Sequence, residues 1–169
     1  MFDFALFMVF PALVAFAGAS DFVTMTIPNR LCLLLAAAFF PVAGLAGLGA
    51  AGIALNASCA MAALALAFAL FSFGWIGGGD AKLFAAAALW FGWEQIAAYA
   101  TAAAIAGGVL SLSYLALRLM PAGPALYLGA RIRSIGQPEI PYGIALAGAA
   151  LALYPHCAWV SGLLRPSVS

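Results

Sequence analysis

Long apolar runs alternate along the chain with short breaks that are polar or rich in glycine. A helix that spans a bilayer needs about 20 mostly apolar residues. The runs are near that length, and the breaks hold the proline, glycine and charged residues that commonly end helices. Pro41 predicts a kink or an early end within the second run. We therefore predict six helices, over residues 4–20, 31–48, 53–73, 81–93, 96–117 and 140–160.

The composition places these helices in a membrane. Of the 169 residues, 67% are hydrophobic and only 7% are charged, whereas soluble domains carry about 25% charged residues. We predict an all-α membrane protein, a six-transmembrane-helix bundle that forms a single domain over residues 1–169. Asp3 stands where a cleaved signal peptide would carry basic residues, so the first run is interpreted as a retained helix.

The charged and sulfur-containing residues argue against two kinds of site. No basic patch of the kind that binds nucleic acid is present. Cys32, Cys59 and Cys157 lie far apart in apolar runs, and no CxxC pair occurs. A thiolate zinc site is therefore not expected, and we predict neither a metal nor another cofactor.

The basic residues predict the orientation of the bundle, because short cytoplasmic loops carry an excess of Lys and Arg. With six helices, the first, third and fifth breaks share one side of the membrane. Five of the six basic residues fall on that side, so it is predicted to be cytoplasmic, with both termini outside. The long stretch 118–139 is then cytoplasmic, and its segment 126–132, "LYLGARI", is predicted to lie along the membrane surface. The five basic residues are Arg30, Lys82, Arg118, Arg131 and Arg133.

The predicted topology places two aspartates close to each other. Asp21 ends the first predicted helix and Asp80 begins the fourth, so both are expected at the same depth beside the cytoplasmic face. Acids at membrane depth are costly, and they usually face a bundle interior or a watery cavity. A simpler interpretation stays open, in which each aspartate only caps a helix or meets solvent.

The residues beside the aspartates favour a functional pair. Gly77, Gly78 and Gly79 remove all side chains before Asp80, which would leave a gap where an extended peptide can reach its carboxyl. A flexible turn is the alternative interpretation of these glycines. After Asp21, Pro28 suits the first turn of the second helix, and Asn29 is expected to hydrogen-bond locally.

Paired carboxyls can share one proton, which is what amide hydrolysis requires. The ionised member takes a proton from water, and the protonated member polarises the scissile carbonyl. A helix N-terminus favours a carboxylate and a C-terminus disfavours one. We therefore expect Asp80 to act as the base and Asp21 as the initial acid.

These motifs resemble those of the prepilin peptidases, a bacterial branch of the GxGD membrane aspartyl proteases. Asp21, five further residues and then Ile-Pro-Asn resemble the first family motif, and Gly77 to Asp80 followed by Lys82 resemble the second. The stretch 140–150, "IPYGIALAGAA", is similar to the last helix of the family. The segment "FVTMT" departs from the family pattern, because relatives usually carry basic residues before Ile-Pro-Asn.

The resemblance implies that Asp21 and Asp80 are catalytic, and it implies a role for the glycines, Pro28, Asn29 and Lys82 in the substrate-binding loops. It implies cleavage of the basic leader of type IV prepilins and pseudopilins at the cytoplasmic face of the bacterial inner membrane. A substrate helix would bind laterally from the lipid bilayer, and pilus assembly machinery is a possible partner. The short chain is similar to the peptidases of tight-adherence (Flp) pilus systems. It lacks the CxxC insert of longer relatives, so a methyltransferase domain is not implied.

Other charged residues have simpler interpretations beside functional ones. Lys82 either pairs with one of the aspartates or extends to the membrane interface. Glu139 either contacts a basic leader or is solvated, whereas Glu94 and His156 are predicted on the far face. Two other functions stay open. One is a small transporter subunit that couples protons or cations through the aspartates, and the other is a non-catalytic assembly protein.

Overall fold

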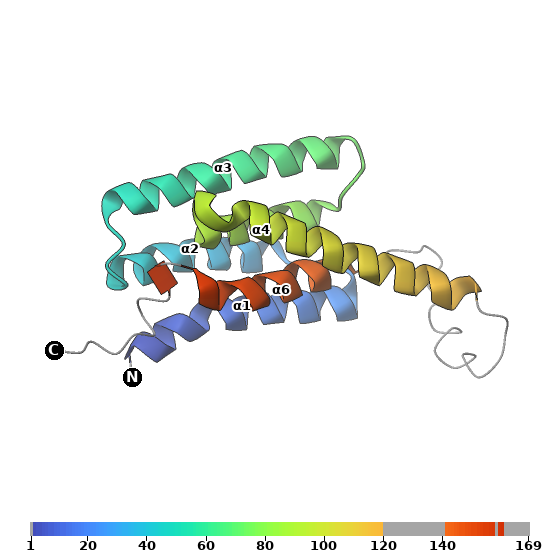
Figure 1. Ribbon diagram of the computed structural model, residues 1–169, viewed down its shortest axis with the longest axis horizontal. Coiled ribbons are helices and arrows are strands. Elements are labelled where there is room, and N and C mark those ends of the chain that lie inside the picture. Colours follow the sequence, from blue (N-terminus) through green and yellow to red (C-terminus); the bar gives the residue numbers. More distant parts are fainter. Residues whose placement is uncertain (1, 120–140, 158, 161–169) are drawn as a thin grey trace.

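All regular structure in the described part of the protein is helical. The computed structural model describes residues 2–119, 141–157 and 159–160, and the helices within them lie roughly side by side along the long axis (Figure 1). The all-α prediction is confirmed for these residues. The helices are α1 (Phe2–Thr24), α2 (Asn29–Leu45), α3 (Ala50–Ser72), α4 (Gly78–Leu119) and α6 (Tyr142–Leu153), followed by the short 3₁₀ helix η1 (Tyr154–His156).

Three of these helices are long and apolar enough to cross a membrane, over Leu6–Thr24, Ala50–Ser72 and Gly78–Ala116. The shorter helix α2 is also apolar. Large apolar side chains lie on the outside of the bundle, among them Phe16, Leu33 and Phe68. Such a surface suits contact with lipid acyl chains, and the protein is therefore a membrane protein.

Helix α4 contains a reversal at Gly92, where φ is 61° and ψ is −174°. Only glycine adopts this conformation readily. The second segment folds back on the first, so that Tyr99 stacks on Phe84 and Phe91 at ring-centroid distances of 5.3 and 4.7 Å. Asn56 of α3 occupies the space where a side chain at position 92 would lie. The helices predicted over 81–93 and 96–117 are thus the two segments of α4.

An aromatic cluster holds the helices together at the end of the bundle opposite Asp80. Phe10 of α1 packs against Trp90 of α4 and Tyr154 of η1, with ring centroids 4.9 and 4.4 Å away. Trp90 donates its indole N–H to the Leu35 carbonyl of α2 at 3.1 Å. These buried contacts fix α1, α2 and the first segment of α4 relative to one another, and with them the aspartates that α1 and α4 carry.

Several predicted boundaries were wrong. Helix α1 continues past Asp21 to Thr24 and ends where Met25 adopts a positive φ of 52°, a conformation typical of helix C-termini. Helix α2 includes Pro41 and ends at Leu45 rather than near residue 48. The last helix ends at Leu153 rather than near residue 160, because Pro155 cannot continue an α-helix. The predicted surface segment 126–132, Arg131, Arg133 and Glu139 lie outside the described residues.

Candidate functional site

Asp21 is the only buried charged residue in the described part of the chain, with 6% of its surface exposed. Its Oδ2 accepts a hydrogen bond of 2.8 Å from the backbone N–H of Gly143. Gly143 lies in the first turn of α6, where backbone N–H groups have no partner within the helix. Asp21 of α1 therefore caps the start of α6.

The contact between Asp21 and α6 requires glycine at position 143. A Cβ atom there would lie 2.7 Å from Asp21 Oδ2 and 2.8 Å from its Cγ, which is closer than real Cβ atoms approach other heavy atoms. The absence of a side chain lets the carboxyl reach the backbone N–H directly.

Hydroxyl groups on both sides of Asp21 stabilise the end of α1. Thr24 donates to the Ser20 carbonyl at 2.8 Å, and Ser20 donates to the Thr26 carbonyl at 3.0 Å. Residues 22–24 of the segment "FVTMT" thus form the end of α1, and Thr26 folds back against Ser20. The hydroxyl groups of Thr24 and Thr26 also share a hydrogen bond of 2.8 Å.

Asp80 lies in the first turn of α4, directly after the three consecutive glycines at positions 77–79. Its carboxyl turns back over Gly77, where a Cβ atom would lie 3.0 Å from Asp80 Oδ2. At Gly79 a Cβ atom would lie 3.4 Å from the Cβ of Ile27, in the loop between α1 and α2. Gly77 therefore gives space to the carboxyl of Asp80, and Gly79 lets α4 approach the loop that follows Asp21.

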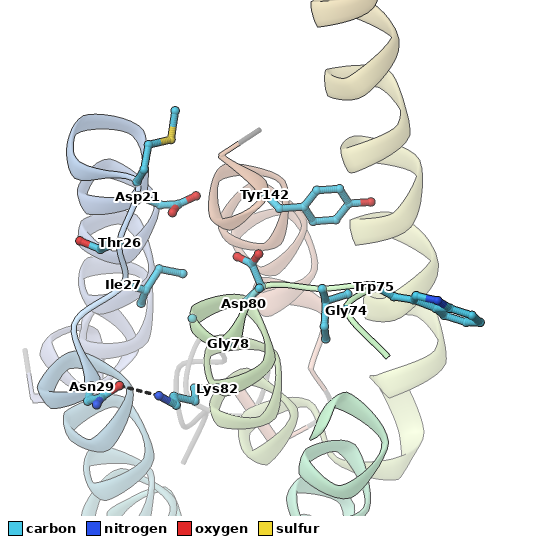
Figure 2. Close-up of a pocket in the computed structure, with 14 residues that line it drawn as sticks. Asp21, Thr26, Ile27, Asn29, Gly74, Trp75, Gly78, Asp80, Lys82 and Tyr142 are labelled. Atoms are coloured by element: carbon cyan, nitrogen blue, oxygen red, sulfur yellow. Dashed lines mark hydrogen bonds between the residues drawn. The ribbon is translucent and has the colours of Figure 1, made fainter. Parts of the chain in front are cut away.

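Asp21 and Asp80 line the same cavity, which has a volume of about 780 Å³. Figure 2 shows the two carboxyls, one from α1 and one from α4, directed into this space beside Tyr142 of α6. The cavity is lined by Asp21, Met25, Thr26, Ile27, Asn29, Gly74, Trp75, Ile76, Gly77, Gly78, Gly79, Asp80, Lys82 and Tyr142.

Asn29 and Lys82 connect the two sequence motifs. Lys82 Nζ donates to Asn29 Oδ1 at 2.8 Å (Figure 2), a partner that we did not predict. The Lys82 side chain is exposed, and its extension to the membrane interface stays a prediction. Asn29 is the first residue of α2, and its side chain bonds to α4 rather than locally as predicted. Pro28 is the N-cap residue of α2, one position before the predicted first turn, and its φ of −61° suits the start of a helix.

Two residues of α6 belong to the site, and sequence reasoning did not assign them to it. Gly143 binds Asp21 through its backbone, and Tyr142 lines the cavity. The ring of Tyr142 lies against Gly107 of α4, where any side chain would overlap it. The only sequence signal was the Pro-Tyr-Gly start of the last run, which contains no residue of obvious chemistry for this site.

The residues predicted on the far face lie away from this cavity. Gln95, beside Glu94, donates to the backbone carbonyl of His156 at 2.6 Å, near the reversal at Gly92. About 12 helical residues separate Asp80 from that reversal, which is about 18 Å along α4. Within the described residues, no group of three His, Cys, Asp or Glu side chains is placed to hold a metal ion.

Comparison with known proteins identifies the family. Residues 8–112 match the type IV leader peptidase family (Peptidase_A24), and the matched range contains both aspartates. Searches against curated proteins and against solved structures found no match. The chain belongs to the type IV leader peptidase family, which implies a peptidase with prepilin-type substrates, and nothing in the comparison supports the transporter alternative.

Proposed function

We propose that this member of the type IV leader peptidase family is an aspartic endopeptidase of the GxGD type. It hydrolyses the bond between leader and mature chain in Flp-type prepilins and pseudopilins. One observation carries the proposal: Asp21 and Asp80, from separate helices, line a single cavity next to a run of glycines. The family match independently supports a leader peptidase.

The proposed reaction uses both carboxyls and one water molecule. One carboxyl is ionised and takes a proton from water, whose oxygen then bonds to the scissile carbonyl carbon. The other carboxyl is protonated and gives its proton to the carbonyl oxygen. The tetrahedral intermediate then loses its C–N bond. The leaving nitrogen takes a proton from the carboxyl that removed it from water, and one hydroxyl of the intermediate returns its proton to the other carboxyl, so that both carboxyls regain their starting states. The products are a new carboxyl terminus on the leader and a new amino terminus on the mature chain.

The shape of the cavity suits a peptide in extended conformation. Gly77, Gly78 and Gly79 form part of its wall and present no side chains beyond the backbone. An extended segment placed along them would bring its scissile carbonyl to the two carboxyls. The assignment of Asp80 as base and Asp21 as acid stays a prediction.

We further propose six membrane passes in the bacterial inner membrane, with both termini outside and the catalytic cavity at the cytoplasmic face. The reversal at Gly92 supports this count. The apolar part of α4 has 39 residues, which as one straight helix would extend about 58 Å, nearly twice the 30 Å apolar core of a bilayer. Folded back at Gly92, it supplies two passes. The chain is proposed to form one domain without methyltransferase activity.

The proposal is tested with the purified protein in lipid vesicles and a Flp-type prepilin. Mass measurement of the products gives the position of the cut. We expect cleavage by the wild type and none by Asp21→Asn or Asp80→Asn, because each substitution removes a group that must exchange a proton. Glu94→Gln, an exposed acid near the reversal, is the matched control and is expected to cleave normally. Near-normal cleavage by either aspartate variant refutes the two-carboxyl mechanism.

A further inference from the structure

A second cavity, of about 390 Å³, lies beside the one that contains the aspartates. Almost all of its wall is apolar, and it is formed by α2, α3 and the first segment of α4. We call it the lateral groove. Its lining residues are Asn29, Cys32, Leu33 and Ala36 from α2, Ala60, Met61 and Leu64 from α3, and Lys82, Ala85, Ala86 and Leu89 from α4.

The arrangement of three helices explains why the groove is open to the side. Both α2 and α3 pack against α4, which forms the floor of the groove with the small side chains of Ala85 and Ala86. The rim carries large apolar side chains that are exposed on the bundle surface, with Leu33 69% and Met61 66% exposed. In a membrane protein such a rim faces acyl chains, so an occupant would enter from within the bilayer.

The groove and the cavity that contains the aspartates share a border. Asn29 and Lys82 line both of them, and the hydrogen bond between these two residues stands at the border. On one side of this pair the wall is apolar, and on the other side lie the two carboxyls and the glycines. A chain that lies in the groove would therefore pass directly from an apolar environment to the proposed site of hydrolysis.

We propose that the lateral groove binds the apolar helical segment that adjoins the cleaved bond of the substrate. This inference rests on the proposed function. Small residues on a groove floor allow close approach of another helix backbone inside a bilayer, and an apolar helix face laid into a groove is a common mode of recognition. A lipid acyl chain would need only the apolar wall. A peptide substrate also extends past Asn29 and Lys82, which line both cavities, to the aspartates.

Cross-linking tests which molecule occupies the lateral groove, because the groove contains a natural thiol at Cys32. The chain is prepared in vesicles with Asp80→Asn to retain uncut substrate, and with Cys59→Ala and Cys157→Ser so that Cys32 is the remaining cysteine. A Flp-type prepilin carries one cysteine, moved stepwise along its apolar segment, and a short bismaleimide joins the two. We expect adducts between Cys32 and the first turns of that segment.

The matched control moves the thiol to the opposite face of α2. Leu34 is 54% exposed and does not line the groove, so the chain with Cys32→Ala and Leu34→Cys is expected to give no adduct. Equal adducts from both chains, or none from Cys32, overturn the proposal. Labelling of Cys32 by a photoactivatable acyl-chain lipid, without substrate adducts, identifies the groove as a lipid site and also overturns it.

A kinetic comparison gives a second readout. Leu64 lines the groove and is 40% exposed, whereas Leu66 on the same helix is 59% exposed and lies outside it. Leu64→Trp is expected to lower kcat/KM for the full prepilin by about tenfold, as loss of one strong contact does, and Leu66→Trp is expected to leave it unchanged. Equal kcat/KM values for the two variants contradict the inference. If the wild type cuts no prepilin, the proposed function fails, while the adducts at Cys32 still report on the groove.

Discussion

The contact between Asp21 and Gly143 gives a sharp prediction for Gly143→Ala. The added methyl group would lie 2.7 Å from Asp21 Oδ2 and 2.9 Å from Asp21 Cβ, so either the carboxyl or helix α6 must shift. Overpacking of this kind costs about 1–3 kcal/mol, and the better helix propensity of alanine offsets up to about 1 kcal/mol of it. The protein should therefore fold.

The expected effect is on catalysis. A misplacement of about 1 Å in a reacting group can lower a rate by about 100-fold, and Asp21 is displaced directly. We expect kcat for prepilin cleavage to fall by roughly that factor, with a change of only a few degrees in the unfolding temperature. Cleavage is measured by the amount of mature product over time in vesicles, and stability by thermal unfolding in detergent.

Two other glycines supply controls for this variant. Gly148→Ala makes the same change on the same helix at a position with nothing within 4 Å of the added Cβ, and it should cleave like the wild type. Gly18→Ala would place its Cβ 2.8 Å from that of Ala147, which separates α1 from α6 without touching Asp21. A Gly143→Ala rate within about twofold of the wild type would refute the positioning role. Equal losses in Gly143→Ala and Gly18→Ala would assign the effect to helix spacing instead.

Three further predictions follow from the same structure. Gly92→Ala forces a side chain onto a φ of 61° and into Asn56, so it should lower the unfolding temperature, whereas Gly108→Ala, which meets nothing within 4 Å, should not. Lys82→Met removes the donor to Asn29 and should lower the free energy of unfolding by about 0.5–1.5 kcal/mol, as measured by denaturant titration; an unchanged value would show that the bond adds no stability. A mechanism with one protonated and one ionised carboxyl predicts a bell-shaped dependence of kcat/KM on pH, which falls in acid when both are protonated and in alkali when both are ionised. A rate that is constant across the pH range would exclude it.

The meeting of the two aspartates could be predicted from the sequence, because it depends on the order of the helices. A chain that leaves the membrane after Asp21 and re-enters before Asp80 places both at one face, whatever the details of packing. The break in α4 was also foreseen, since Gly92 stands among residues where two apolar runs meet. Both inferences use only the direction of the chain and the spacing of apolar runs.

The backbone partner of Asp21 could not be predicted in the same way. A glycine at the start of an apolar helix carries no side chain that marks it for hydrogen bonding, and its role depends on how closely α1 and α6 approach. The partner of Lys82 depended likewise on the relative rotation of α2 and α4. By contrast, the early end of α6 follows from the sequence, because Pro155 lies within the helix predicted over 140–160 and proline cannot continue an α-helix.

The bond from Gly143 to Asp21 has a consequence for the newly made protein. During synthesis, both acids leave the ribosome well before the segment that carries the amide donor. A nascent chain that has inserted only α1 to α4 therefore holds Asp21 without its partner, in an incomplete site. We expect proteolytic competence to arise only once the last helix has docked, so that unfinished chains cut no neighbouring proteins in the membrane.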